Sequence, residues 1–97
     1  MLKITPDPPQ DRTITHTAEK AFGPLDSTNR PFFTVREGIP VEDALEHVVM
    51  LLNCAEATGW DTAEHLELND KALALTIIQS VESARALIEA LLDSVKA

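Results

Sequence analysis

The sequence has few of the residues on which many small proteins build stability or chemistry. Its 97 residues include one cysteine, Cys54, so no disulfide can form within the chain. The three glycines, Gly23, Gly38 and Gly59, are isolated, which excludes the glycine-rich loops that bind nucleotide phosphates. No charged segment is followed by the long apolar run typical of a secretion signal. We therefore expect a cytoplasmic protein without a nucleotide-dependent activity.

Positive charge is also scarce. Asp and Glu number 16 against 8 Lys and Arg, so the formal net charge is -8. Surfaces that bind nucleic acids or anionic lipids carry an excess of Lys and Arg, and direct binding to either is therefore not expected. Residues 1–31 are neutral overall, so the rest of the chain carries the whole net charge. Such an acidic surface either binds a basic partner or keeps a small, apolar-rich protein soluble.

Proline is missing from the last 57 residues, because all six prolines lie between residues 6 and 40. Residues 1–31 contain only scattered large apolar side chains, too few to offset the entropy of ordering the segment. We expect a mobile Pro-rich N-terminal arm over residues 1–31, with at most one helical turn at residues 18–22. Residues 32–97 are then the folded domain.

A short strand is predicted at residues 32–36, where aromatic and β-branched residues follow Pro31. No other segment has a strand-like composition. The strand is therefore expected either to pair with its own copy in a second subunit or to lie as an extended strap across helices. A helix should begin near Pro40, since proline is tolerated in a first helical turn and Glu42 and Asp43 favour the positive end of the helix dipole.

Two amphipathic helices are predicted, at about residues 40–58 and 70–96, joined by a loop around residues 59–69. Their apolar residues recur at intervals of three and four. In the first helix these are Val41, Leu45, Val48, Leu52 and Ala55, and in the second Leu73, Ile77, Val81, Ala84, Ile88, Leu91 and Val95. Met50 and Cys54 project from the opposite side of the first helix. The fold class is thus all-α, an antiparallel helical hairpin.

A single hairpin offers each apolar stripe only one neighbour, and both stripes are too wide for that. About 60 ordered residues without a disulfide or a metal form a marginal core. We therefore predict a homodimer in which two hairpins form a four-helix bundle. The alternative is a monomer whose N-terminal segment covers the remaining apolar surface.

Three stretches of the sequence resemble a known family. They are ITPDPP at residues 4–9, FTVREGIPVEDAL at residues 33–45 and LLNCAE at residues 51–56. Together they are similar to a family of short pseudomonad proteins described as a domain of unknown function. The resemblance implies a bacterial source and a shared architecture. It implies no activity, cofactor or catalytic residue.

The residues offer no constellation for metal binding or catalysis. The candidate metal ligands are Cys54, His47, His65 and His16, but His47 and Cys54 lie two helical turns apart, about 10 Å, too far to bind one ion unaided. Residues of the loop or of a second subunit would have to complete such a site. A catalytic Cys54 would need a base and a lowered thiol pKa, and the middle of a helix supplies neither. We expect no cofactor, no metal and no enzymatic activity.

Surfaces therefore remain as the candidates for function. Trp60 either closes the end of a small core or anchors a partner. The candidate interface residues are Phe32, Phe33, Val35, Met50, Cys54 and Trp60. The sequence favours a non-enzymatic homodimer that binds an unidentified protein. The alternative is an acidic regulator, resembling an antitoxin or a nucleic-acid mimic, that acts on a basic nucleic-acid-binding protein.

Overall fold

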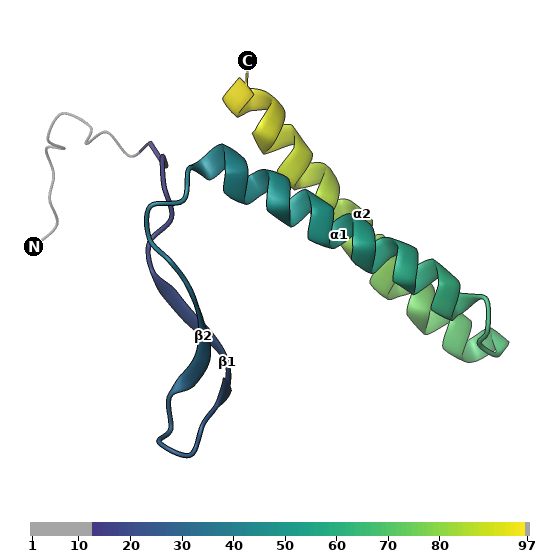
Figure 1. Cartoon of the computed structure of the whole chain (residues 1–97). Helices are drawn as coiled ribbons and strands as arrows, with labels where there is room; N and C mark the ends of the chain where they lie inside the picture. The colour runs from purple at the N-terminus through teal and green to yellow at the C-terminus, as the bar shows by residue number, and fades with distance from the viewer. Residues whose placement is uncertain (1–12, 97) are drawn as a thin grey trace, which may run out of the picture. The chain divides into compact units, whose positions relative to one another are not determined.

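The computed structural model of the chain describes residues 13–96, without the side chain of Lys96. Its elements are, in order, β1 (Lys20–Leu25), β2 (Pro31–Val35), α1 (Val41–Ala63) and α2 (Leu68–Lys96), as Figure 1 shows. The chain divides into two compact units, Met1–Val41 and Glu42–Ala97. We call their described parts the β-hairpin unit and the helical unit. The predicted helical hairpin is confirmed, and a small antiparallel sheet accompanies it.

The predicted strand is confirmed as β2, but the expectation that no other segment could pair with it is wrong. Strand β1 pairs with it antiparallel, with Phe22 opposite Phe33. No helical turn forms at residues 18–22. Gly23 adopts a φ of 95°, which accommodates the irregularity in register between Phe22 and Leu25, and the ring of Phe33 lies over this glycine. The Gly-Pro pair, which in the sequence resembles a helix stop, lies within a strand.

A tight turn joins the two strands. The Asp26 carboxylate accepts hydrogen bonds from the Thr28 hydroxyl at 2.6 Å and from the backbone N–H groups of Thr28 and Arg30 at 2.7 and 3.1 Å. These bonds, the one from the Thr28 hydroxyl first, hold the pKa of Asp26 below its usual value. Asn29 takes a positive φ of 67°, which asparagine tolerates better than most residues.

The two chain segments stay together beyond the strands. Thr17 donates its backbone N–H to the carbonyl of Ile39 and accepts one from Gly38, both at 2.9 Å, and Val41 donates to Thr15 at the same distance. Residues 13–25 thus form one side of a β-hairpin, and the boundary between the two units lies after Val41. Residues 1–12 of the expected arm lie outside the described residues.

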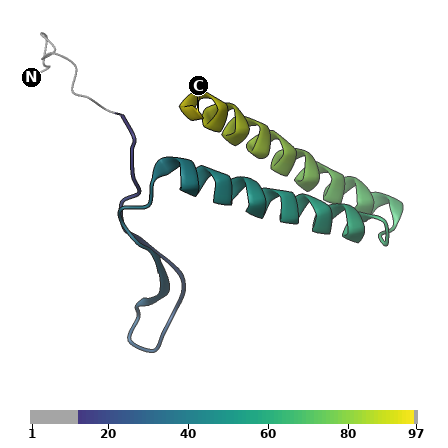
Figure 2. The same cartoon turned by 45° about the horizontal axis from the view of Figure 1, so that its top comes forward.

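Helices α1 and α2 lie side by side and antiparallel, as both views show (Figures 1 and 2). Helix α1 continues through Gly59 to Ala63, and α2 already begins at Leu68, so the loop is shorter than expected. Gly59 does not end the helix because it faces α2: a Cβ built there would lie 2.8 Å from Cγ1 of Ile78. Neither helix of the described chain is long and apolar enough to cross a lipid bilayer.

The helices meet through a thin core. Among residues 13–96 the buried hydrophobic side chains are Ala63, Ile78 and Leu92. Arg85 ties the helices together, since its guanidinium donates to Asn53 of α1 at 2.8 Å and forms an ion pair with Glu56. A contact this narrow buries only part of each helix's apolar surface.

Only part of the apolar stripe predicted in α2 faces α1: Val81, Ala84 and Ile88 are partly buried, and the flanking positions on one side of the stripe are buried or partly buried. The side chains turned inward follow the spacing of Ala74, Ile78, Arg85 and Leu92, whereas residues such as Leu73 are largely exposed. The cause is the ion pair of Arg85 with α1, together with the fit of Ile78 against the glycine of α1. Both rotate α2 so that half of its apolar stripe points outward.

Candidate interaction surfaces

Large aliphatic side chains are exposed along α2. Leu73, Ile77 and Leu87 expose 67%, 66% and 68% of their surface, and Leu91 exposes 55%. Their spacing places them on one side of the helix, where the partly buried Ala84 continues the row. These residues belong to the stripe predicted from the sequence, except Leu87, which flanks it.

Helix α1 adds to the same side of the hairpin. Arg85 marks the opposite side, because it reaches Asn53 on α1 and approaches Glu89 on α2. On α1, Asn53 lies on one flank of the residues that face α2, and Leu51 and Ala55 lie on the other flank. Leu51 is 52% exposed. One side of the hairpin is therefore aliphatic. We call it the aliphatic face: Leu51, Ala55, Leu73, Ile77, Ala84, Leu87 and Leu91.

The other side of the hairpin is polar and acidic. Glu46, Glu82 and Glu89 share it with Arg85, and residues 42–97 contain 11 acidic and 3 basic residues, which gives 3 minus 11, or -8. The helical unit thus carries the net charge of the whole chain, since the first 41 residues hold five of each sign. The helical hairpin as a whole is therefore amphipathic, with one aliphatic side and one acidic side.

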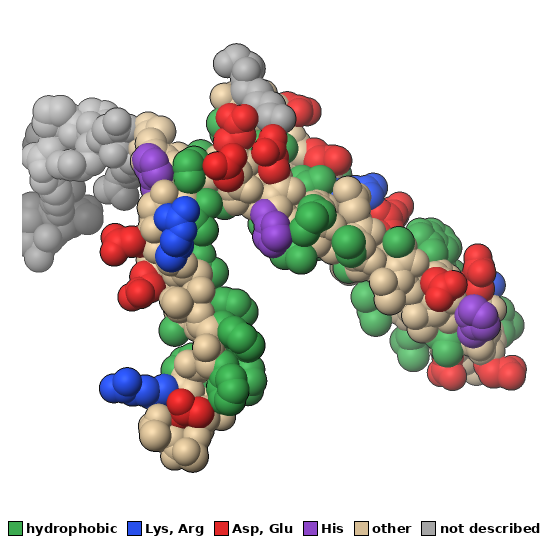
Figure 3. Space-filling model, viewed as in Figure 1, with side chains coloured by type: hydrophobic (Ala, Val, Ile, Leu, Met, Phe, Trp, Pro, Cys, Tyr) green, Lys and Arg blue, Asp and Glu red, His purple; other side chains and the backbone are tan. Residues whose placement is uncertain are grey.

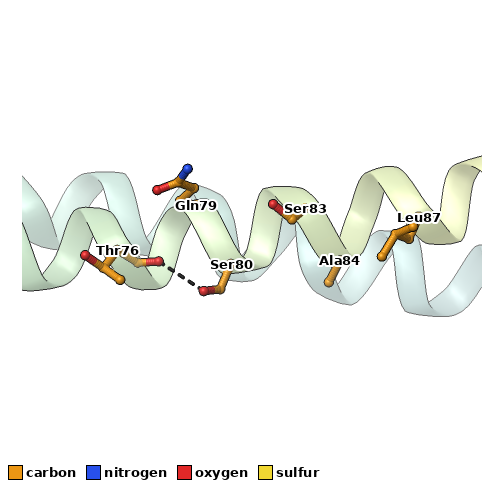
Figure 4. Close-up of a pocket in the computed structure, with 6 residues that line it drawn as sticks. All are labelled: Thr76, Gln79, Ser80, Ser83, Ala84 and Leu87. Carbon is orange, nitrogen blue, oxygen red and sulfur yellow. Dashed lines mark hydrogen bonds between the residues drawn. The ribbon is translucent and has the colours of Figure 1, made fainter.

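Small residues narrow α2 near its middle. A shallow groove of about 500 Å³ lies there, lined by Thr76, Gln79, Ser80, Ser83, Ala84 and Leu87 (Figure 4). All of these residues belong to α2. The Ser80 hydroxyl donates to the Thr76 carbonyl at 3.2 Å, the bond drawn in Figure 4, and the Thr76 hydroxyl donates to Ala72 at 3.1 Å. The groove is thus a narrow part of α2 between larger side chains. The hydroxyls of Ser80 and Thr76 are both hydrogen-bonded within the helix.

A second apolar surface lies on the β-hairpin unit. The rings of Phe22 and Phe33 lie 5.7 Å apart and those of Phe32 and Phe33 6.0 Å apart, and each of the three residues is at least half exposed. Figure 3 shows hydrophobic side chains along one side of this hairpin and charged ones along the other. We call the three rings the aromatic cluster. The sequence points to two of its members and misses Phe22, because local composition does not indicate strand β1.

The remaining predicted interface residues are divided between the two units. Val35 is half-buried at the end of β2, while Met50 and Cys54 lie one turn apart on the outward side of α1. Trp60 belongs to helix α1 rather than to a loop, and it is 46% exposed. Nearly half of the residue's surface is therefore available for contacts.

The described part of the chain offers few groups of side chains suited to metal binding or acid–base chemistry. Among residues 13–96, no three His, Cys, Asp or Glu side chains come close enough together to hold a metal ion. The exposed Asp26 carboxylate, with its lowered pKa, is occupied by the turn that it stabilises. The features that stand out are thus the two apolar surfaces and the acidic side of the helices.

Known proteins add one finding. The sequence pattern of a family of unknown function, DUF6124, matches residues 32–94, which cover most of β2, all of α1 and most of α2. The chain belongs to this family. The resemblance noted in the sequence is thereby confirmed, although the match says nothing about the source of the family's members. No curated protein and no solved structure matches the chain.

Proposed function

We propose that this DUF6124 protein is a non-enzymatic protein–protein interaction module that works as a homodimer. In the dimer, two helical hairpins pack through their aliphatic faces and form a four-helix bundle. The observation that carries the proposal is the aliphatic face itself, in which Leu73, Ile77, Leu87 and Leu91 of α2 are each more than half exposed. Such contiguous apolar surface marks an interface in soluble proteins.

A second copy fits this face better than the β-hairpin of the same chain does. Leu73 and Leu91 are 18 positions apart, or about 27 Å along the helix. The apolar part of β1, Phe22 to Leu25, extends only about 10 Å at a strand's rise per residue. Another helical hairpin has the same length as the face and the same apolar character. Full burial of a leucine or isoleucine side chain is worth about 1.5–3 kcal/mol, and covering the exposed part of each of these residues contributes a share of that amount to association.

Dimerisation also explains how the charge is arranged. Packing the aliphatic faces together leaves the acidic sides of both hairpins in solvent, at opposite faces of the bundle, where their mutual repulsion is screened. The dimer would then present these acidic sides and the aromatic clusters, and a partner protein would bind through one of these surfaces.

Absolute mass by light scattering on a sizing column tests the proposal. We expect a dimer whose mass does not change over a hundredfold range of protein concentration. Leu87→Glu should give a folded monomer, because it places two charges in the interface. Ala86→Glu adds the same charge at the neighbouring exposed position, about 100° around the helix and outside the aliphatic face, and should remain a dimer. A wild-type protein that is monomeric at every concentration would contradict the proposal.

The concentration of negative charge on the helical unit favours a second candidate function. The module could act as an acidic regulator that occupies the nucleic-acid-binding surface of a basic protein. Binding of this kind weakens steeply as salt is raised, because it depends on exposed charges. Neutralising Glu46, Glu82 and Glu89 to glutamine should weaken it as well. Association that is insensitive to salt and to these changes would rule this candidate out.

A further inference from the structure

The aliphatic residues of α2 are arranged symmetrically about the middle of the helix. From the ends inward, Leu73 and Leu91, then Ile77 and Leu87, then Ser80 and Ala84 lie at equal distances from position 82. Large side chains thus stand at both ends of the row, and small ones stand at its centre.

This order is what a self-complementary helix contact requires. When two identical surfaces pack about a two-fold axis, residue i of one copy meets residue j of the other, and j meets i. In an antiparallel pair of α2 helices centred at position 82, Leu73 would meet Leu91 of the other copy and Ile77 would meet Leu87. Each large side chain would face a large one, and the two small residues would face each other.

The small residues at the centre of the row permit two helices to approach closely there. Ser80 and Ala84 line the shallow groove on α2, so the backbones of two helices can come nearer at that level than where leucines meet. Burying the groove would leave neither of its bonded hydroxyls unsatisfied, because Ser80 and Thr76 already donate to carbonyls of their own helix. For these two hydroxyls the usual cost of covering a polar group is therefore small.

Helix α1 presents small residues at the same level. Arg85 meets Glu56, and Ile78 lies against Gly59, so the middle of α2 lies level with the part of α1 that contains Ala55. Ala55 is exposed on the aliphatic face. A two-fold axis that crosses the face at this level would therefore bring α1 against its copy at an alanine.

We infer that α2 packs antiparallel against α2 of a second copy of this chain, about a two-fold axis that passes between Ser80 and Ala84. The inference rests on the proposed homodimer and specifies its register. It excludes a parallel contact, in which Leu73 would meet its own copy. It also excludes a bundle in which α2 packs chiefly on α1 of the other copy.

Cysteine cross-linking in the full-length protein tests the register. The background is Cys54→Ser, which removes the native thiol. The test variant carries Leu73→Cys and Leu91→Cys, and each single substitution serves as a control. The two positions are about 27 Å apart within one chain, so they can join only between copies. A mismatched pair, Leu73→Cys with Leu87→Cys, is offset by four residues, about 6 Å, from the proposed register.

We expect at least a tenfold higher yield of covalent dimer from the matched pair than from either single variant or the mismatched pair. Ile77→Cys with Leu87→Cys provides a second matched pair, should the first weaken association. Light scattering of the reduced proteins distinguishes a failure of the proposed register from a failure of the proposed homodimer. A dimer that cross-links in neither matched pair, or through Leu73→Cys alone, overturns the register and leaves the homodimer standing. A Cys54→Ser protein that is monomeric overturns both.

Discussion

Adding one methyl group at Gly59 tests how closely the two helices approach. In an exposed helical position, replacing glycine with alanine stabilises a protein by about 1 kcal/mol, because glycine loses more backbone entropy on folding. At this position the new methyl would lie 2.8 Å from Cγ1 and 3.4 Å from Cδ1 of Ile78, which is only 2% exposed. Cγ1 is near the backbone, so it cannot swing aside as the end of a long side chain could.

The overlap should outweigh the gain in helix propensity. Overpacking a well-filled contact costs about 1–3 kcal/mol. Gly59→Ala is therefore expected to leave stability unchanged or lower it by up to about 2 kcal/mol, in place of a gain of about 1 kcal/mol. In an Ile78→Ala background, which removes the facing atoms, the same change should stabilise the protein by about 1 kcal/mol. The sign of the effect thus depends on a single neighbour.

Urea unfolding followed by circular dichroism, at one fixed protein concentration, measures all four proteins of this cycle. Ala57→Gly, on the exposed side of the same helix, calibrates the intrinsic cost of glycine in α1. A gain of about 1 kcal/mol from Gly59→Ala in both backgrounds would show that the helices do not touch at this position. The account of why α1 continues through Gly59 would then be refuted.

Three further predictions concern single residues. The hydrogen bond from the Thr28 hydroxyl is the largest cause of the lowered pKa of Asp26. The contribution of Asp26 to stability is therefore complete above its unfolded pKa near 3.8 and is lost as pH falls through the lower folded pKa. An NMR titration of the turn measures that folded pKa. Arg85→Met should cost about 1–3 kcal/mol in urea unfolding, because Glu56, whose side chain is 14% exposed, would lose its charged partner. Gly23→Ala should move the hairpin's NMR shifts toward random-coil values, because a positive φ of 95° and a facing aromatic ring leave no room for a methyl.

The helices could be predicted from the sequence because their apolar periodicity extends over many turns. The start of α1 agrees with the prediction, since Pro40 and two acidic residues signal a first turn. Its end does not agree, because Gly59 has the same sequence signature whether it stops a helix or lets a second helix approach. Only the contact with Ile78 separates the two cases.

Only one of the two strands of the β-hairpin could be predicted from the sequence. Strand β2 is rich in aromatic and β-branched residues, whereas β1 contains Gly23 and Pro24, which argue against a strand. That segment is a strand because of its pairing with β2, the register irregularity at the glycine and the turn held by Asp26. These contacts join residues that are distant in sequence, and local composition does not reveal them.

The width of the apolar stripes in the sequence indicates a second neighbour for the hairpin, but not which residues meet it. That choice depends on the rotation of α2 about its axis, which Arg85 and Ile78 set by contacting α1. An ion-paired arginine occupies an inward position, and so Leu73 and Ile77 are turned outward. The arginine that ties α2 to α1 thereby turns outward the surface that we propose joins two chains. Its removal should therefore affect association as well as folding, which links the stability of the monomer to the register of the dimer.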